Sequence, residues 1–158
     1  MKHMACVVFI ALLARPVPAS AQSVKSEDPL LGTWQLNVAQ STYKPGPAPR
    51  AQTRIYKKHR FGIEATVKTI QADGRSTTVQ SVYDYDQQEH PVTGSEDVDA
   101  IVVTRTSAQA YGATFSHAGQ SMGTLERIIS SDGRRMTVTT RRRVPEITNV
   151  EVYEKDEP

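Results

Sequence analysis

The chain of 158 residues contains a single cysteine, Cys6, which we expect to be lost with an N-terminal leader. A mature chain without cysteine forms no disulfide and offers no thiolate as a nucleophile or metal ligand, so packing alone must stabilise it. Three histidines would remain, His59, His90 and His117, and their spacing does not match a metal-ligand pair on one strand or helix. The sequence therefore predicts no metal and no other cofactor.

Motifs of the common catalytic sites are also missing. The chain has no Gly-x-Ser-x-Gly motif, no phosphate-binding loop and no dinucleotide-binding fingerprint. The acidic stretch around His90 lacks the regular alternation of ligands with a glycine that a calcium loop shows, so we expect a solvated turn there. We assign no catalytic residue from the sequence.

A run long enough for a transmembrane helix is missing as well. Residues 5–14 are almost wholly apolar, but this run is too short to span a bilayer. It follows the basic Lys2 and precedes Ala19-Ser20-Ala21, a pattern typical of a secretory signal peptide and its cleavage site. We therefore expect residues 1–21 to be a signal peptide and the mature protein to lie in the periplasm or outside the cell, with no transmembrane segment.

An excess of charge of one sign is missing once the leader is removed. Cleavage removes Lys2 and Arg15 and no acidic residue, so the 19 basic and 17 acidic residues become 17 and 17. A neutral chain gives no support to a nucleic-acid partner. The remaining length suits one domain, and we expect a flexible arm over residues 22–29, the domain over 30–154 and a tail over 155–158. Nothing in the sequence indicates an oligomeric state.

The chain does contain many short runs rich in Thr, Val, Ile and Tyr, separated by turn residues. These runs predict strands at residues 52–60, 62–71, 76–85, 98–107, 110–117, 122–130, 134–143 and 147–154, in addition to the strand that contains Trp34. Apolar residues at helical spacing do not fill any window of helix length, and only a short helical turn near residues 37–42 remains open. The sequence therefore predicts an all-β protein.

Two turns containing Asp-Gly predict strand register. At Ala72-Asp73-Gly74, a three-residue loop with glycine in the left-handed conformation pairs Val67 with Val79 and Ile63 with Tyr83, which makes one face apolar.

The same loop at Ser131-Asp132-Gly133 pairs Ile128 with Met136. This register turns Ile128 and Glu126 to the inside of the sheet and Arg127 to water.

Gly32-Thr33-Trp34 resembles the Gly-x-Trp opening of the lipocalin and calycin barrels, in which the tryptophan plugs one end. Together with residues 41–49 and 85–94, it makes the chain resemble the small secreted lipocalin-like proteins of bacteria. The resemblance implies a single antiparallel up-and-down β-barrel of about eight or nine strands, lipocalin-like, with Trp34 as a structural plug. It also implies a late arginine that covers the tryptophan, and Arg141–Arg143 are the candidates.

Strand alternation predicts the side chains that line the inside of such a barrel. The candidate ligand-binding residues are the aromatic Tyr83, Tyr85, Tyr111 and Phe115 and the polar Arg105, His117, Glu126 and Arg142. Apolar walls with a few polar groups are typical of a small-molecule pocket. We therefore expect the barrel to bind a small hydrophobic or amphipathic ligand, mainly by burial against the aromatic rings.

Several alternatives stay open. The polar candidates can lie near strand ends in water, and the aromatic ones can be plain core. The barrel can instead be an enzyme of the cyclase or isomerase type, with Glu126, His117, Tyr83 or Tyr111 as general acid or base. It can also be a filled barrel whose exterior binds another protein or an envelope component, and a two-layer sandwich would show the same periodicity.

Overall fold

The computed structural model describes residues 27–157, so the predicted signal peptide over 1–21 and the first part of the predicted arm lie outside the described residues. It contains ten strands: β1 (Gly32–Lys44), β2 (Ala51–His59), β3 (Gly62–Ile70), β4 (Ser76–Tyr83), β5 (Glu89–Thr93), β6 (Ala100–Arg105), β7 (Ala110–His117), β8 (Gln120–Ile129), β9 (Arg135–Arg143) and β10 (Glu146–Lys155). Helix is absent from these described residues.

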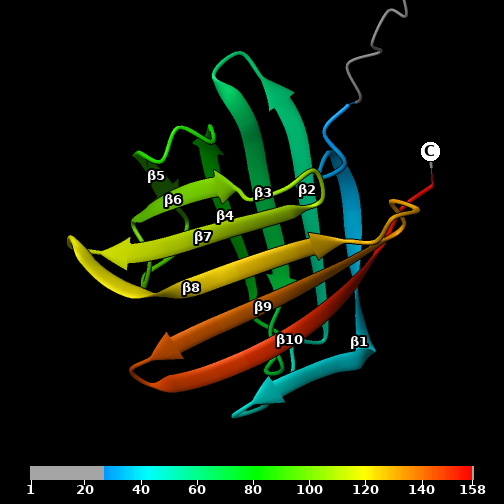
Figure 1. Cartoon of the computed structure of the whole chain (residues 1–158). Helices are drawn as coiled ribbons and strands as arrows, with labels where there is room; N and C mark the ends of the chain where they lie inside the picture. Colours follow the sequence, from blue (N-terminus) through cyan, green and yellow to red (C-terminus); the bar gives the residue numbers. More distant parts are fainter. Residues whose placement is uncertain (1–26, 158) are drawn as a thin grey trace, which may run out of the picture.

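Each strand pairs with its neighbours in the chain in antiparallel orientation, and β1 also pairs with β10. The sheet therefore closes into one up-and-down barrel, which Figure 1 shows from the side. This confirms the predicted fold class, with ten strands in place of eight or nine.

The additional strand is β5, where we expected a solvated turn. It pairs with β4 only through Gln80–Thr93 and Ser81–Val92. Pro91 lies inside it, and a proline cannot donate a ladder hydrogen bond. A short strand with a proline and acidic neighbours has the composition of a turn, so only its pairing identifies it.

The helical turn considered for residues 37–42 is a bulged part of β1. The register of β1 on β10 shifts between Asn37 and Thr42, and the Ser41 hydroxyl donates a 2.7 Å hydrogen bond to the backbone oxygen of Asn37. Strand β1 pairs with β2 only over Gly32–Gln35 and then follows β10 alone. Strand β1 therefore pairs with strands on both sides only near its start.

The predicted register of the β3–β4 hairpin is confirmed. Val67 pairs with Val79 and Ile63 with Tyr83. The three-residue loop is closed by a 2.8 Å hydrogen bond from Gln71 N to Arg75 O, and its glycine has the positive φ of 91° that the prediction requires.

The predicted register of the β8–β9 hairpin is wrong by one residue, because its loop has four residues. The backbone nitrogen of Ser130 donates to Arg135 O at 2.8 Å, and the Asp132 carboxylate accepts from Ser130 Oγ at 2.6 Å and from Arg134 N at 3.0 Å. These local bonds draw Arg134 into the loop. Met136 therefore pairs with Ile129.

A shift of one residue exchanges the two faces of a strand. On β8 it turns Arg127 and Ile129 to the inside of the barrel and Glu126 and Ile128 to the outside. The expected inward positions of Glu126 and Ile128 are therefore wrong.

Trp34 is fully buried at one end of the barrel. Its indole nitrogen donates a 2.9 Å hydrogen bond to Leu30 O, and the Lys155 ammonium lies 5.0 Å from the centre of its ring. The cation over the tryptophan is therefore Lys155, the last residue of β10, and not one of the expected Arg141–Arg143.

Asp28, which we expected in a flexible arm, fixes the N-terminal segment across the same end. It accepts hydrogen bonds from the hydroxyls of Tyr111 at 2.5 Å and Tyr85 at 2.8 Å. The Arg105 guanidinium lies 3.9 Å away. Side chains from the segment around Leu30 therefore close this end of the barrel, which we call the closed end.

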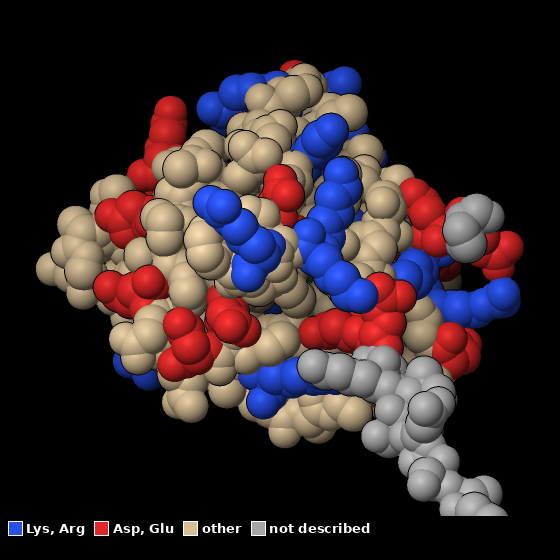
Figure 2. All heavy atoms as spheres, turned by 90° about the horizontal axis from the view of Figure 1, so that it is seen from above, with Lys and Arg blue, Asp and Glu red and all other residues tan. Residues whose placement is uncertain are grey.

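The surface around the closed end carries both signs of charge. Figure 2 shows Lys and Arg side chains interspersed with Asp and Glu over this face. Among residues 27–157, the structure contains no helix long and apolar enough to cross a membrane.

The observed β8 register makes a testable prediction about two adjacent isoleucines. Ile129 is 2% exposed and Ile128 is 49% exposed. Ile129→Ala should lower the free energy of unfolding by about 2–5 kcal/mol through a core cavity. Ile128→Ala should lower it by less than about 1 kcal/mol. Urea denaturation of both variants measures this, and the reverse order would support the register predicted from the sequence.

Candidate functional site

A cavity of about 600 Å³ lies inside the barrel. Its rim includes Arg75, Glu96 and Asp97, whose side chains are exposed, so the cavity opens to solvent at the end opposite Trp34. Strands run alternately between the closed end and this mouth. Position along a strand therefore gives depth in the cavity.

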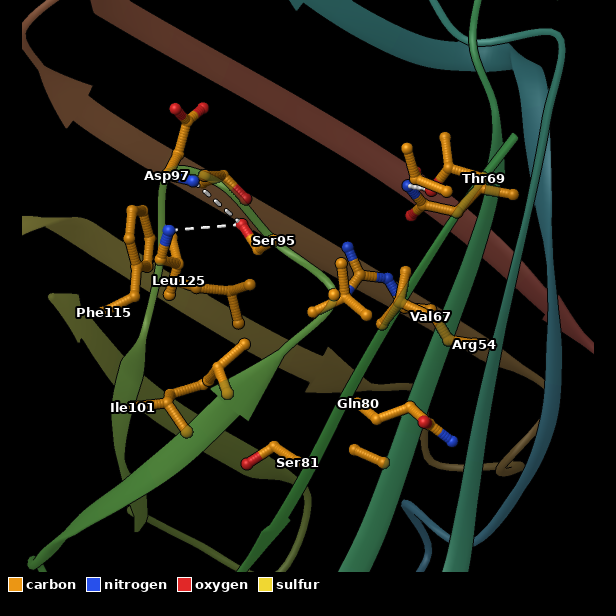
Figure 3. A pocket seen from close by; sticks show the side chains of 18 of the residues that line it. Arg54, Val67, Thr69, Gln80, Ser81, Ser95, Asp97, Ile101, Phe115 and Leu125 are labelled. Carbon is orange, nitrogen blue, oxygen red and sulfur yellow. Dashed lines mark hydrogen bonds between the residues drawn. The ribbon is translucent and has the colours of Figure 1, made fainter. Parts of the chain in front are cut away.

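The walls of the cavity are largely apolar. Ile101, Phe115 and Leu125 group on one side, opposite Val67 and Arg54, as Figure 3 shows. Val79 also lines the cavity, where it pairs with Val67 across the β3–β4 hairpin. These side chains give the upper part of the cavity a surface suited to a hydrocarbon chain.

Buried charge begins beside this apolar surface, because Arg54 pairs with Val67 across β2 and β3. Arg54 on β2 and Glu151 on β10 form a buried ion pair, with 3.1 Å between Nη2 and Oε2. Glu151 also accepts hydrogen bonds from the hydroxyls of Tyr43 at 3.2 Å and Tyr153 at 3.0 Å. The charge of Arg54 is therefore balanced by a carboxylate whose oxygens are well satisfied.

Arg127 on β8 is a second guanidinium inside the barrel and is only 3% exposed. Its Nε and Nη1 atoms have no hydrogen-bond partner among the described residues, and no carboxylate of residues 27–157 lies within ion-pair distance of it. The guanidinium carbon lies 5.7 Å from the centre of the Tyr56 ring. Such a cation–π contact contributes about 0.5–2 kcal/mol, whereas an unpaired buried charge costs several.

Two tyrosine hydroxyls share this region with Arg127. Tyr56 and Tyr83 are both buried, both line the cavity, and neither hydroxyl has a hydrogen-bond partner within residues 27–157. Burial raises the pKa of the Tyr56 hydroxyl, but the positive charges of Arg127 and Arg54 outweigh it, so this pKa lies below the ordinary tyrosine value. Burial raises the pKa of Tyr83 well above it.

An ion pair lies at the mouth of the cavity. Arg142 on β9 reaches to Asp97 in the loop between β5 and β6, with 3.5 Å between Nη1 and Oδ2. The Ser95 hydroxyl orders this loop by accepting from Asp97 N at 3.3 Å and Val98 N at 3.2 Å (Figure 3). This ion pair lies at the rim, where the Arg142 side chain is 16% exposed and the Asp97 side chain is 72% exposed.

Five of the eight predicted ligand-binding residues fall into two groups. Tyr83, Phe115 and Arg142 line the cavity. Tyr85 and Tyr111 lie at the closed end, where their hydroxyls bind Asp28.

The remaining three candidates, Arg105, His117 and Glu126, do not line the cavity. Glu126 points outward because of the register of β8. His117 points outward because the register of β7 shifts between Phe115 and Ser116, and its side chain is half exposed. Arg105 ends β6 and donates to backbone oxygens of the next loop.

The sequence interpretation missed the residues that carry the buried charge, namely Arg54, Tyr56, Arg127, Glu151 and Tyr153. On β2 and β10 a signal was present, because Arg54 alternates with Tyr56 and Glu151 with Tyr153, so each charge shares a face with an aromatic ring. Arg127 carried no such signal, since its face depends on the length of one loop.

The described part of the chain has no group of three or more His, Cys, Asp or Glu side chains that could hold a metal ion. A scan against protein-family models finds no match, and no curated protein matches the chain. The class of the protein therefore follows from the fold and the cavity. It is a closed up-and-down β-barrel with an open interior cavity and buried charge at its base.

The opposed pKa shifts predict a two-phase alkaline titration of the six tyrosines. Tyr56 should ionise first, because its pKa is lowered, and the other five after it, because burial raises the pKa of each. Near-ultraviolet absorbance measures phenolate, and Tyr56→Phe should remove the first phase. A first phase that persists in this variant would contradict the assignment.

The same shifts fix the sign of the pH effect on stability. The five tyrosines with raised pKa contribute stability that is present below the ordinary tyrosine pKa and is lost as the pH rises towards their folded values. Tyr56 acts the other way, and its contribution is lost as the pH falls through its folded pKa. The net stability should therefore fall at alkaline pH.

Proposed function

We propose that the protein is an exported, lipocalin-like barrel that binds a small, mainly apolar ligand in its interior. The observation that carries this proposal is the open cavity of about 600 Å³, whose surface is mainly apolar and whose lining also includes polar and charged side chains. Small-molecule sites commonly have volumes of about 300–1,000 Å³ and this kind of lining. Burial of the ligand against Phe115, Val67 and Val79 would supply most of the binding free energy.

Two observations favour binding over the alternatives. Glu126 and His117, two of the candidate acid-base residues, lie outside the cavity. An interior of this volume also favours a ligand-binding barrel over a filled one that acts only through its exterior.

The experiment is a titration with N-phenyl-1-naphthylamine, a neutral dye whose fluorescence rises in apolar surroundings. Val79→Trp places an indole ring inside the cavity, and Thr78→Trp adds the same ring to the outer face of the same strand. We expect the dye to bind the native protein and Thr78→Trp with equal affinity. We expect Val79→Trp to bind the dye at least about tenfold more weakly, because the dye loses a buried contact area equal to one side chain, which is worth about 1.5–3 kcal/mol.

Equal dye binding by both variants would place the dye outside the barrel. Absence of dye binding by the native protein would contradict the proposed function. Circular dichroism of each variant shows whether the barrel is intact before the comparison is made.

A further inference from the structure

The base of the cavity has a surplus of positive charge. Arg54 and Arg127 both line the cavity, and only Arg54 has a carboxylate, the buried Glu151, within ion-pair distance, so one positive charge is uncompensated while the tyrosines are neutral. Arg54 is paired with Glu151, which leaves the surplus on Arg127. A single negative charge would balance it.

The polar groups near Arg127 that have no partner can all act as hydrogen-bond donors. Nε and Nη1 of Arg127 and the hydroxyls of Tyr56 and Tyr83 can all donate a hydrogen bond, and these atoms are buried without a partner in the described part of the chain. An acceptor-only anion such as a carboxylate satisfies several donors at once. A cationic ligand would meet the repulsion of two guanidiniums and would leave these donors unsatisfied.

Two other arginines predicted to line the barrel differ from Arg127. Arg142 at the mouth has Asp97 within 3.5 Å, although its Nε also lacks a partner, and Arg105, which lies outside the cavity, donates to two backbone oxygens. Arg127 is set apart because it is nearly fully buried and its charge faces no carboxylate of residues 27–157.

The position of these donors fixes how a ligand would lie. Tyr83 is the last residue of β4, and Tyr56 and Arg127 are close to the ends of β2 and β8 that lie at the closed end. The apolar wall of Ile101 and Phe115 lies nearer the mouth, because β6 begins and β7 finishes there. Ile101 and Phe115 therefore form an apolar section between the donors near the closed end and the charged rim that contains Arg142 and Asp97.

We propose that the cavity binds a small amphipathic monoanion head first. Its carboxylate, or another singly charged oxyanion, accepts hydrogen bonds from Arg127, Tyr56 and Tyr83, and its hydrocarbon chain extends past Ile101 and Phe115 towards the mouth. This inference rests on the proposed function, because it names the ligand class of the same cavity.

The test is calorimetric titration of the protein with probes that share one chain and differ in head group. The probes are decanoate, decyl sulfate, 1-decanol and decylammonium, each below its micelle concentration, with inorganic sulfate as an anion that has no chain. We expect decanoate or decyl sulfate to bind at least about tenfold more tightly than 1-decanol, as one charge-assisted hydrogen bond provides. Decylammonium and inorganic sulfate should bind much more weakly.

The matched variants are Arg127→Met inside the barrel and Arg135→Met on the exposed face of β9. Arg127→Met should bind decanoate no better than 1-decanol, while its affinity for 1-decanol stays within about threefold of the native value. Arg135→Met should keep the native preference. A second readout needs no variant: bound decanoate should raise the pKa of Tyr56 by neutralising Arg127, which moves the first phase of the tyrosine titration to higher pH.

The outcomes separate this inference from the proposed function. Equal affinity for 1-decanol and both decyl anions, or undiminished decanoate binding by a folded Arg127→Met, would overturn the monoanion inference and leave the small-molecule barrel standing. Sulfate binding as tight as that of decyl sulfate would overturn the amphipathic part. Failure of every decyl probe and of the neutral dye would overturn both proposals.

Discussion

The pairing of β1 with β2 on one side and β10 on the other is the constraint on which the interior depends. Strand β1 pairs with β2 over Gly32–Gln35 and with β10 from Trp34 onward, so the sheet closes at the end where Trp34 is buried. Closure also brings Arg54 and Glu151, which are 97 positions apart in the chain, to 3.1 Å. Without this pairing the inner face would be open to water and the buried charges would need no partners.

An inward charge in a closed barrel is stabilised by an internal partner, by water that enters from the mouth or by a ligand. Arg54 has an internal partner in Glu151, and Arg142 has one in Asp97 at the rim. Arg127 is 3% exposed, and two of its nitrogens have no partner among the described residues. An unpaired buried charge lowers the stability of the fold and is typical of a binding site, because an apolar residue at the same position would make the protein more stable.

How much of this could be read from the sequence differs from strand to strand. Alternation and turn residues were sufficient for the all-β class and for the register of Val67 on Val79, because local chemistry fixes that hairpin. They failed at β8, where the hydrogen bonds of Asp132 lengthen the loop by one residue and exchange the faces. Closure contacts such as that between Asp28 and Tyr111 depend on distant segments and leave no local pattern.

The most direct measurement of the central claim is the free energy of unfolding of Arg127→Met without ligand, after refolding from denaturant to remove bound molecules. If Arg127 is an unpaired charge kept for an anion, the variant should be as stable as the native protein or more stable by about 1–4 kcal/mol. A loss of about 3–5 kcal/mol would instead show that Arg127 has a structural partner, and would contradict an anion-binding role for the base of the barrel.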